Sequence, residues 1–388
     1  MTYRILLLND ISPAGLQRFP ADRYQVGRDL DRPDAILVRS HDMHAMKIPD
    51  SVLAVARAGI GVDNIPVERF TLRGIPVFNT PGANANAVKE LVIAGMLLAA
   101  RRIAPAWDFV RGLQGDAAAV AAAVEQAKKQ FAGFELAGRT LGVVGLGAVG
   151  AEVANAAVGL GMRVIGFDPA ISVSRAWQLS SDVQQAGSLD TLFIDSDLVT
   201  LHVPLTEETR GMVGAPRLGL LREGGVLLNF ARAGLVDDAA LVEALDAGKL
   251  FAYVTDFPTP AVKDHPRVTA LPHLGASTGE AEVSSVAMAA DHLRDFLEDG
   301  VIRHSVNLPD AVLPRGAGSR IAIANANVPG VVGHVSTALA EAGLNIAEML
   351  NTSRGEVAYT LVDVEGVTPP EVFARIAAIE GVLRARLL

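Results

Sequence analysis

The sequence predicts an α/β protein built on parallel sheets, with a smaller strand-rich module at its C-terminal end. Short apolar runs alternate with segments of helical periodicity through most of the 388 residues. Most of these runs are continuously apolar, which is typical of strands buried on both faces. A glycine-rich turn at residues 145–150 joins one such run to an apolar helix. Residues 308–319 hold two prolines and two glycines without periodicity, which indicates a linker, and the pattern changes after them.

The apolar runs place the strands of the parallel sheets. The expected strands are Ile5–Leu8, Ala35–Val38, Leu53–Ala56, Val77–Asn79, Thr140–Val144, Arg163–Phe167, Leu198–His202, Gly225–Asn229, Ala252–Asp256 and Val268–Leu271. Two longer stretches, Val88–Arg102 and Ala281–Leu297, have helical apolar spacing and are expected to be hinges. The simplest architecture is a split lobe of residues 1–102 and 282–310, with residues 103–281 inserted into it as a second lobe.

The pattern after the linker predicts a separate module over residues 319–388. Its expected elements are a strand at Ile321–Ala324, a helix at Gly330–Ala342, strands at Asn345–Thr352 and Glu356–Val364, a helix at Pro370–Ile379 and a strand at Val382–Leu387. This βαββαβ order is that of a ferredoxin-like module. Such a unit at a C-terminus is more often regulatory or oligomerising than catalytic.

Composition excludes several classes of protein. The net charge is −9 at pH 7 and no basic run is visible, which argues against nucleic-acid binding because that affinity depends on neutralising phosphates. The chain has no cysteine, so disulfides and thiolate metal sites are excluded, and we expect a cytoplasmic protein without a metal site. No uninterrupted apolar run of about 18 residues occurs, so no membrane association is predicted.

The glycine-rich turn predicts a dinucleotide site in a Rossmann-type unit. A strand runs into Gly145-Leu146-Gly147-Ala148-Val149-Gly150, and a helix follows. Gly145 permits the tight turn, Gly147 lets the backbone approach a pyrophosphate, and Gly150 lets the helix pack closely on the strand. Asp168 ends the next strand, where a carboxylate binds ribose hydroxyls and repels a 2′-phosphate. NAD is therefore the expected cofactor; a tight turn in an ordinary α/β sheet is the alternative.

Two residues at strand ends are suited to hydride transfer from a 2-hydroxy acid. This chemistry needs a base for the hydroxyl proton and a cation that binds the carboxylate. His273 follows a short apolar run and precedes small residues, and Arg232 follows the strand that ends at Asn229. Ligands of open α/β sheets bind at the carboxyl ends of strands. On position alone, a structural histidine and an arginine that caps the sheet remain alternatives.

Several stretches, in this order, are similar to the D-isomer-specific 2-hydroxyacid dehydrogenase family. They are Arg57–Asn64, Asn79–Asn84, the glycine-rich turn, Asn229–Asp237 and Pro272–Thr278. Within the family, the chain resembles the D-3-phosphoglycerate dehydrogenases that carry a C-terminal ACT domain, and the resemblance covers essentially the whole chain. It implies NAD-dependent oxidation of 3-phospho-D-glycerate to 3-phosphohydroxypyruvate, the first step of L-serine biosynthesis. It also implies a flavodoxin-like substrate lobe with an inserted Rossmann NAD-binding lobe.

The resemblance assigns roles to individual residues. Arg232 becomes the catalytic arginine, His273 the acid/base and Asp256 the contact of the nicotinamide carboxamide. The implied substrate-binding residues are Arg39, Ser40, Arg57, Gly59 and Asn84. The implied NAD-binding residues are Thr80, Gly145, Gly147, Ala148, Val149, Gly150, Asp168, Val203, Phe230, Ala231, Arg232, Asp256, His273, Gly275 and Ala276.

Two departures from the family pattern concern the catalytic residues. The family has a glutamate shortly after the strand that ends at Asp256, and this carboxylate orients the histidine; here the chain reads Asp256-Phe257-Pro258-Thr259-Pro260. Asp264 and Glu280 are the candidates to replace it. The catalytic arginine is usually followed by two glycines, and here Ala233 comes first.

The C-terminal module resembles an ACT domain through residues 325–333 and 343–347. In the family, asparagines at these positions bind an amino acid, typically L-serine, across a subunit interface, which here implies Asn325, Asn327 and Asn345 as regulatory residues. Asparagine amides can bond both the carboxylate and the ammonium group of such a ligand. The alternative is that these asparagines only shape turns.

Other functions remain open at this point. One is a different D-2-hydroxyacid dehydrogenase, and another is a catalytically weak NAD(H)-sensing protein on the same scaffold. By resemblance, we expect a homodimer or homotetramer, because the helical insert Asp116–Lys129 lies where subunits of the family pair. The inserted lobe also suggests that the lobes close over the substrate.

Overall fold

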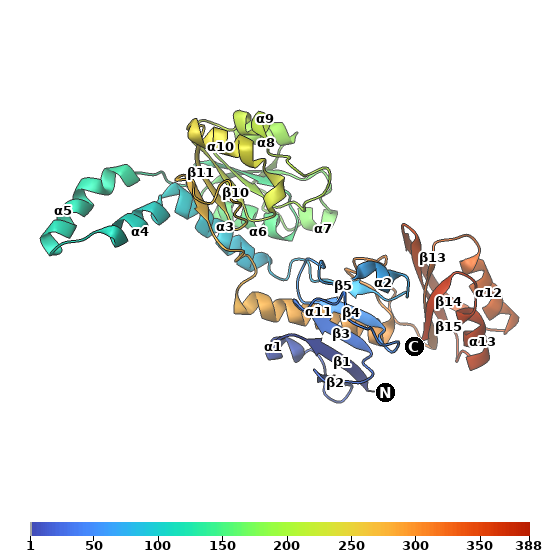
Figure 1. The fold of residues 1–388 in the computed structure, drawn as a ribbon. Helices are drawn as coiled ribbons and strands as arrows, with labels where there is room; N and C mark the ends of the chain where they lie inside the picture. The colour runs from blue at the N-terminus through green and yellow to red at the C-terminus, as the bar shows by residue number, and fades with distance from the viewer. Residues whose placement is uncertain (1) are drawn as a thin grey trace. The chain divides into compact units, whose positions relative to one another are not determined.

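The computed structural model describes residues 2–388, and the chain divides into two compact units (Figure 1). The split unit comprises the residues up to Ala83 together with Glu282–Leu388, and the inserted unit is Asn84–Ala281. Among the described residues, no helix combines the length and the apolar character that crossing a membrane requires.

A five-stranded parallel sheet forms the first part of the split unit. Its order, β2-β1-β3-β4-β5, is the flavodoxin-like order, in which ligands bind at the carboxyl ends of β1 and β3. The strands are β1 Tyr3–Leu8, β2 Tyr24–Gly27, β3 Ala35–Val38, β4 Ala54–Arg57 and β5 Val77–Phe78; the helices are α1 Pro13–Leu16, α2 Val67–Thr71 and α11 Gly279–Asp299. Helix α11 packs on this sheet because Val286, Ala289, Leu293 and Phe296 form one buried stripe at helical spacing.

The inserted unit contains a seven-stranded parallel sheet of order β12-β11-β10-β9-β6-β7-β8. This is the doubly wound Rossmann order, with its topological switch point between β6 and β9. The strands are β6 Thr140–Val144, β7 Arg163–Phe167, β8 Val183–Gln185, β9 Leu198–Leu201, β10 Gly225–Asn229, β11 Leu250–Thr255 and β12 Val268–Ala270. The helices are α3 Ala85–Ala100, α4 Ile103–Gly112, α5 Ala117–Ala127, α6 Ala148–Gly159, α7 Val173–Ala176, α8 Leu189–Asp195, α9 Ala215–Leu220 and α10 Asp238–Asp246.

The predicted fold class is confirmed, including each expected strand of the two parallel sheets. The strands β2 and β8 were not expected, because both are short edge strands with a polar or glycine residue in half of their positions or more. Residues 84–102, which the sequence placed with the first lobe, group with the inserted unit. The reason is that Val92 and Met96 of α3 pack into the core of that unit with Leu141 and Leu228.

The C-terminal module is an antiparallel sheet of order β14-β15-β13-β16 with two helices, which is the predicted ferredoxin-like arrangement. Its elements are β13 Ser319–Ala326, α12 Val331–Glu341, β14 Ile346–Arg354, β15 Val357–Val364, α13 Pro370–Ala377 and β16 Val382–Leu387. The module belongs to the split unit, where it carries the red end of the chain in Figure 1.

The two central strands of the C-terminal sheet, β13 and β15, are buried on both faces along most of their length. Ile321 and Ile323 of β13 pack with the helices of the module. The alternate residues Ala322 and Ala324 instead join the core that includes Phe296 of α11. Because side chains alternate along a strand, one strand serves two cores, and the module shares its second core with the flavodoxin-like lobe.

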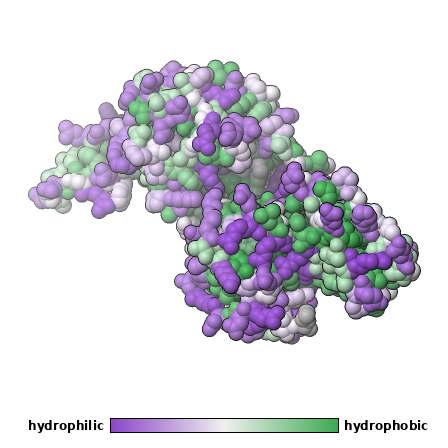
Figure 2. All heavy atoms as spheres, turned by 45° about the vertical axis from the view of Figure 1, so that its right-hand side comes forward, coloured by the Kyte–Doolittle hydropathy of each residue, from purple (hydrophilic) through white to green (hydrophobic). Residues whose placement is uncertain are grey.

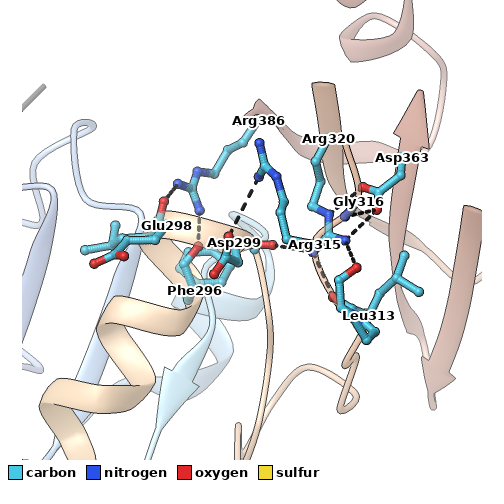
Figure 3. Close-up of polar contacts among 12 residues, drawn as sticks. Phe296, Glu298, Asp299, Leu313, Arg315, Gly316, Arg320, Asp363 and Arg386 are labelled. Carbon is cyan, nitrogen blue, oxygen red and sulfur yellow. Dashed lines mark hydrogen bonds and ion pairs between the residues drawn. The ribbon is translucent and has the colours of Figure 1, made fainter. Parts of the chain in front are cut away.

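A buried arginine adds polar contacts to this packing (Figure 3). Arg320 donates two 2.6 Å hydrogen bonds to the carboxylate of Asp363. Its other N–H groups donate to the carbonyl oxygens of Asp299, Leu313 and Pro314. Burial opposes ionisation of Asp363, but the hydrogen bonds from Arg320 outweigh it and lower the pKa of the carboxyl group. The guanidinium therefore ties two strands of the module to the linker and to the end of α11.

His292 is a buried titratable group on α11. Its ring centroid lies 5.8 Å from that of Phe78 and 5.4 Å from that of His304, and its Nε2 atom has no hydrogen-bond partner. Burial, and secondarily the nearby His304, lowers the pKa of His292 from 6.5 to about 4. The folded protein therefore holds this imidazole neutral.

We predict that His292→Leu makes the protein less sensitive to acid. Below pH 6.5 the unfolded chain binds a proton at His292 that the folded chain binds only near pH 4, so stability falls across this window by about 1.4 kcal/mol per pH unit. Urea unfolding of both proteins at pH 7.5 and pH 5 measures this, and the midpoint should fall less for the variant. His334→Leu, at an exposed position, is the control, and an equal fall for His292→Leu and the wild type would contradict the prediction.

Candidate active site

The glycine-rich turn has the geometry of a phosphate-binding turn. Gly145 has a φ of +88°, and a Cβ atom on Gly150 would lie 1.9 Å from the carbonyl oxygen of Gly145. Gly147 differs, because its backbone is extended and a Cβ atom there would meet nothing within 4 Å. The protein itself does not require a glycine at residue 147. The space beside it therefore fits a pyrophosphate, which the N–H groups of Ala148 and Val149 at the start of α6 would face.

Asp168 connects the turn to the end of β7. Its Oδ2 atom accepts a 2.8 Å hydrogen bond from the N–H of Leu146, and its Oδ1 atom accepts one of 2.9 Å from Ala170. Each oxygen keeps a lone pair free, and the side chain is half-buried. The carboxylate can therefore shape the turn and still accept from ribose hydroxyls.

His202, after β9, is a neighbour of the turn that the sequence did not single out. Its Nε2 atom lies 3.0 Å from the hydroxyl of Thr200, and burial lowers the pKa of His202 from 6.5 to about 3. A Cβ atom on Gly145 would lie 2.6 Å from the carbonyl oxygen of His202 and 2.8 Å from the side chain of Val203. The backbone carbonyl of His202 and the side chain of Val203 thus pack against the turn.

A buried amide fixes the segment that carries Arg232. The Oδ1 atom of Asn229 accepts from the N–H groups of Ala231 and Arg232 at 3.2 and 3.3 Å, and its Nδ2 atom donates to the carbonyl of Arg232 at 2.9 Å. The carbonyl of Asn229 accepts a 2.8 Å hydrogen bond from the hydroxyl of Thr255 on β11. The ring of Phe230 points away from this edge and packs against α3 at Gly95. Arg232 itself is exposed.

Asp256 has a free acceptor where the nicotinamide was expected. Its Oδ2 atom accepts a 3.1 Å hydrogen bond from the N–H of Gly275, whereas its buried Oδ1 atom has no partner. Burial raises the pKa of Asp256. A buried carboxylate oxygen without a donor costs free energy, and the N–H group of a carboxamide would satisfy it. This unpaired atom, the open space at Gly147 and the carboxylate of Asp168 all fit NAD.

Phe257 lies between the two predicted catalytic residues. The centroid of its ring is 4.5 Å from that of His273, with an interplanar angle of 45°. The guanidinium carbon of Arg232 lies 5.7 Å from the same ring centroid. The structure therefore brings Arg232 and His273 together at the carboxyl ends of β10 and β12. Sequence reasoning missed Phe257, and the signal available was its position directly after Asp256 at a strand end. Ala276, three residues beyond His273, is exposed on the same loop.

The split unit places most of the predicted substrate residues at the carboxyl end of its own sheet. Arg39 forms a 2.9 Å ion pair with Glu282, and the N–H of Ser40 donates to Asn9 after β1. Arg57 donates from Nε to the carbonyl of Arg39 at 3.0 Å. Arg39 and Ser40, but not Arg57, border a cavity of about 350 Å³, which is also lined by Asn9, Asp10 and Arg28.

Two further predicted residues, Thr80 and Asn84, lie close in sequence to the boundary between the units, and Thr80 bonds to a third, Gly59. The carbonyl of Gly59 accepts from the N–H of Thr80, whose buried hydroxyl has no partner. Asn84 belongs to the inserted unit, where it precedes α3 and its buried Oδ1 atom is also unpaired. Thr80, predicted for the cofactor, thus belongs to the split unit, and Asn84, predicted for the substrate, to the inserted one.

The three asparagines of the C-terminal module do not meet within one chain. Asn325 is paired with Ala358 on β15, while the carbonyl of Asn345 accepts from Glu365. Glu365 directly follows β15 and is seven residues beyond Ala358, so these two points are roughly 23 Å apart at about 3.3 Å per residue. The buried Oδ1 atom of Asn325 has no partner, whereas Asn327 and Asn345 are exposed.

The contrast between two glycines of the turn gives a paired prediction. Gly147→Thr keeps a good helix N-cap and adds side-chain atoms only to open space, so the protein should fold normally and bind NADH at least about tenfold more weakly, or about 1.4 kcal/mol. Gly150→Ala should instead lower the melting temperature, because its Cβ atom would overlap the carbonyl oxygen of Gly145. Thermal melting and NADH fluorescence titration measure both effects; unchanged NADH affinity in Gly147→Thr would contradict the proposed role of the open space.

Residues 93–275 match the model of the D-isomer specific 2-hydroxyacid dehydrogenase, NAD binding domain. A hydroxypyruvate reductase of Thermotoga maritima is 37% identical over 266 residues, which cover 64% of this chain and 80% of that protein. A D-3-phosphoglycerate dehydrogenase of Archaeoglobus fulgidus is 37% identical over 297 residues, or 74% of this chain and 54% of that protein. The chain thus spans about half the length of the curated D-3-phosphoglycerate dehydrogenases it matches.

The fold comparison agrees with the sequence comparison. The NAD⁺-bound 3-phosphoglycerate dehydrogenase of Entamoeba histolytica superposes with a TM-score of 0.60 at 26% identity, covering 79% of this chain and 99% of that one. The expectation of an NAD-binding domain is confirmed by the matched family model. With its Rossmann unit, its Arg232 and His273 at the same edge of the sheet, and these relatives, the chain belongs to the D-isomer-specific 2-hydroxyacid dehydrogenase family.

Proposed function

We propose that the chain oxidises 3-phospho-D-glycerate to 3-phosphohydroxypyruvate with NAD, as the cytoplasmic first step of L-serine synthesis. The observation that carries the chemistry is the placement of Arg232 and His273 on the same aromatic ring at the carboxyl edge of the Rossmann sheet. The names of the curated relatives support the substrate.

His273 and Arg232 have different roles in the proposed reaction. The neutral imidazole of His273 accepts the proton of the C2 hydroxyl as the C2–H bond breaks. The guanidinium of Arg232 binds the substrate carboxylate and stabilises the charge that develops on the C2 oxygen. Bound NAD supplies the hydride acceptor. The buried Asp256 would hold the carboxamide of the cofactor through its unpaired oxygen.

The charges of the split unit suit a phosphorylated acid. Arg39 and Arg57 lie at the carboxyl edge of the flavodoxin-like sheet and are joined by the hydrogen bond from Arg57 to the carbonyl of Arg39. Arginine presents a planar set of donors that matches a phosphate. Glu282, now paired with Arg39, would have to release it when a phosphate binds.

Reduction of hydroxypyruvate or another 2-keto acid is the second candidate. The Thermotoga maritima relative named hydroxypyruvate reductase is covered over 80% of its length, and the site geometry does not depend on a phosphate. An NAD(H) sensor is the third, because no carboxylate bonds to His273 among the described residues. Turnover of the preferred acid separates these candidates.

The decisive experiment is a substrate panel with purified protein, run with and without L-serine. We expect the highest kcat/KM on 3-phospho-D-glycerate with NAD, and a loss of about 10²–10⁴-fold in His273→Ala and Arg232→Ala because acid–base and electrostatic terms of this size disappear. NADH binding should persist in both variants. Higher kcat/KM on an unphosphorylated acid would favour the second candidate, and NADH binding without any turnover would favour the third.

We also propose that the chain forms a homodimer or homotetramer through an arm made of α4 and α5. The arm projects from the body of the inserted unit (Figure 1), and α4 has no buried residue. Ile103, Trp107 and Val110 form one apolar stripe with exposures of 45, 59 and 50%. Figure 2 shows apolar atoms among hydrophilic ones on this arm. Three large apolar side chains on one stripe indicate a binding surface, and a second copy of the arm is the partner we propose.

Trp107→Asp should therefore lower the mass measured by light scattering on a sizing column, because it places a charge in the middle of the apolar stripe. Trp177→Asp changes the other tryptophan, which is 85% exposed, and should leave the mass unchanged. A monomeric wild-type protein would exclude the proposed assembly.

Binding of L-serine at the C-terminal module would require such an assembly. Asn325 and Asn327 lie far from Asn345 within one chain, so the ligand would contact Asn325 and Asn327 of one copy and Asn345 of another.

A further inference from the structure

His273 lacks the carboxylate partner that usually orients a catalytic histidine. Among residues 2–388, no hydrogen bond or ion pair joins a carboxylate to its imidazole. Asp264 pairs with Lys263 before β12, whereas His273 follows β12, so the two residues are at opposite ends of that strand. Glu280 is exposed in the first turn of α11. Neither replaces the missing glutamate.

Asp256 does not take over this role in the structure either. It interacts electrostatically with His273, but one of its oxygens is used by the N–H of Gly275 and the other has no partner. If the imidazole donated to Asp256, that second oxygen would be satisfied. Among the described residues, the ring contact of this imidazole is with Phe257, at 4.5 Å between centroids.

Phe257 is itself held in place by the two neighbouring strands. Its backbone N–H donates a 3.0 Å hydrogen bond to the hydroxyl of Thr255, and the same hydroxyl donates to the carbonyl of Asn229. Asn229 also binds the backbone of Arg232. The backbone segments that carry the ring of Phe257 and the guanidinium of Arg232 are therefore joined by one hydrogen-bond network. Its central residues, Asn229 and Thr255, are both fully buried.

We propose that Phe257 is the positioning residue of the hydride-transfer site, orienting the imidazole of His273 by ring packing where a carboxylate is absent, and spacing it from Arg232. The inference rests on the proposed function for its kinetic consequence. A tilted aromatic pair has a preferred geometry, and it restricts rotation of the imidazole without adding a charge. The same ring receives the cationic Arg232 on its face. One side chain thus sets the distance between the base and the carboxylate-binding cation.

The test compares Phe257→Ala, Phe257→Tyr and a matched control, Phe134→Ala. Phe134 is also half-buried and also contacts one ring, that of Phe251 at 5.4 Å, and one guanidinium, that of Arg139 at 4.2 Å. We expect Phe257→Ala to lower kcat by roughly 10- to 100-fold, because a misplacement of about 1 Å can cost about 10²-fold, with NADH affinity unchanged. Phe257→Tyr, which keeps the ring, should retain the wild-type kcat, and so should Phe134→Ala.

A second measurement does not depend on turnover. In protein with labelled histidine, the imidazole signals of His273, assigned with His273→Gln, should carry the ring-current shift of Phe257 and lose it in Phe257→Ala but not in Phe134→Ala. If no acid is turned over, the proposed function fails while this measurement still decides whether Phe257 holds the imidazole. Unchanged His273 signals in Phe257→Ala, an unchanged kcat in that variant, or an equal loss of kcat in Phe134→Ala would overturn the proposal.

Discussion

The geometry of the candidate site depends on the hydrogen bonds that the side-chain amide of Asn229 makes to the backbone of residues 231 and 232. This amide is fully buried, and it binds both the N–H and the carbonyl group of Arg232. A buried polar group without a partner costs about 1–3 kcal/mol, so the backbone after β10 is held in the one arrangement that satisfies this amide. Through Thr255, the same residue reaches the loop after β11. Two loops that carry functional side chains therefore share one internal support.

This arrangement follows from a general property of parallel sheets. The carboxyl ends of neighbouring strands lie at one edge, so short loops after them bring distant residues together. In each parallel sheet of this chain, that edge gathers a different set of polar side chains. In the inserted unit, the edge holds Asp168, Arg232, Asp256 and His273. In the split unit, the corresponding edge holds Arg39, Ser40 and Arg57, of which the two arginines are positively charged.

The sequence predicted those parts of the fold and of the candidate site that depend on local sequence pattern. Continuous apolar runs located the strands of both parallel sheets, and the glycine spacing with Asp168 located the cofactor turn. Phe257, Asn229 and Thr255 could not be assigned their roles in this way, because a phenylalanine, an asparagine and a threonine near strand ends have many uses. Their function depends on which strand lies beside which, and that order is set by tertiary packing. The expected boundary at residue 102 differs from the observed one for a similar reason, since α3 is apolar on a face that only the folded structure assigns to the inserted unit.

The burial of both faces of β13 and β15 has a consequence for how the chain unfolds. The chain contains three recognisable folds, yet Ala322, Tyr359 and Leu361 of the last one complete the core of the first. Separating them would expose apolar surface on both and leave Arg320 without its carbonyl partners on α11 and the linker. Calorimetry should therefore register two cooperative transitions and not three. In thermodynamic terms, the C-terminal module is part of the flavodoxin-like lobe, although about 240 residues of sequence stand between that lobe's last parallel strand and the module.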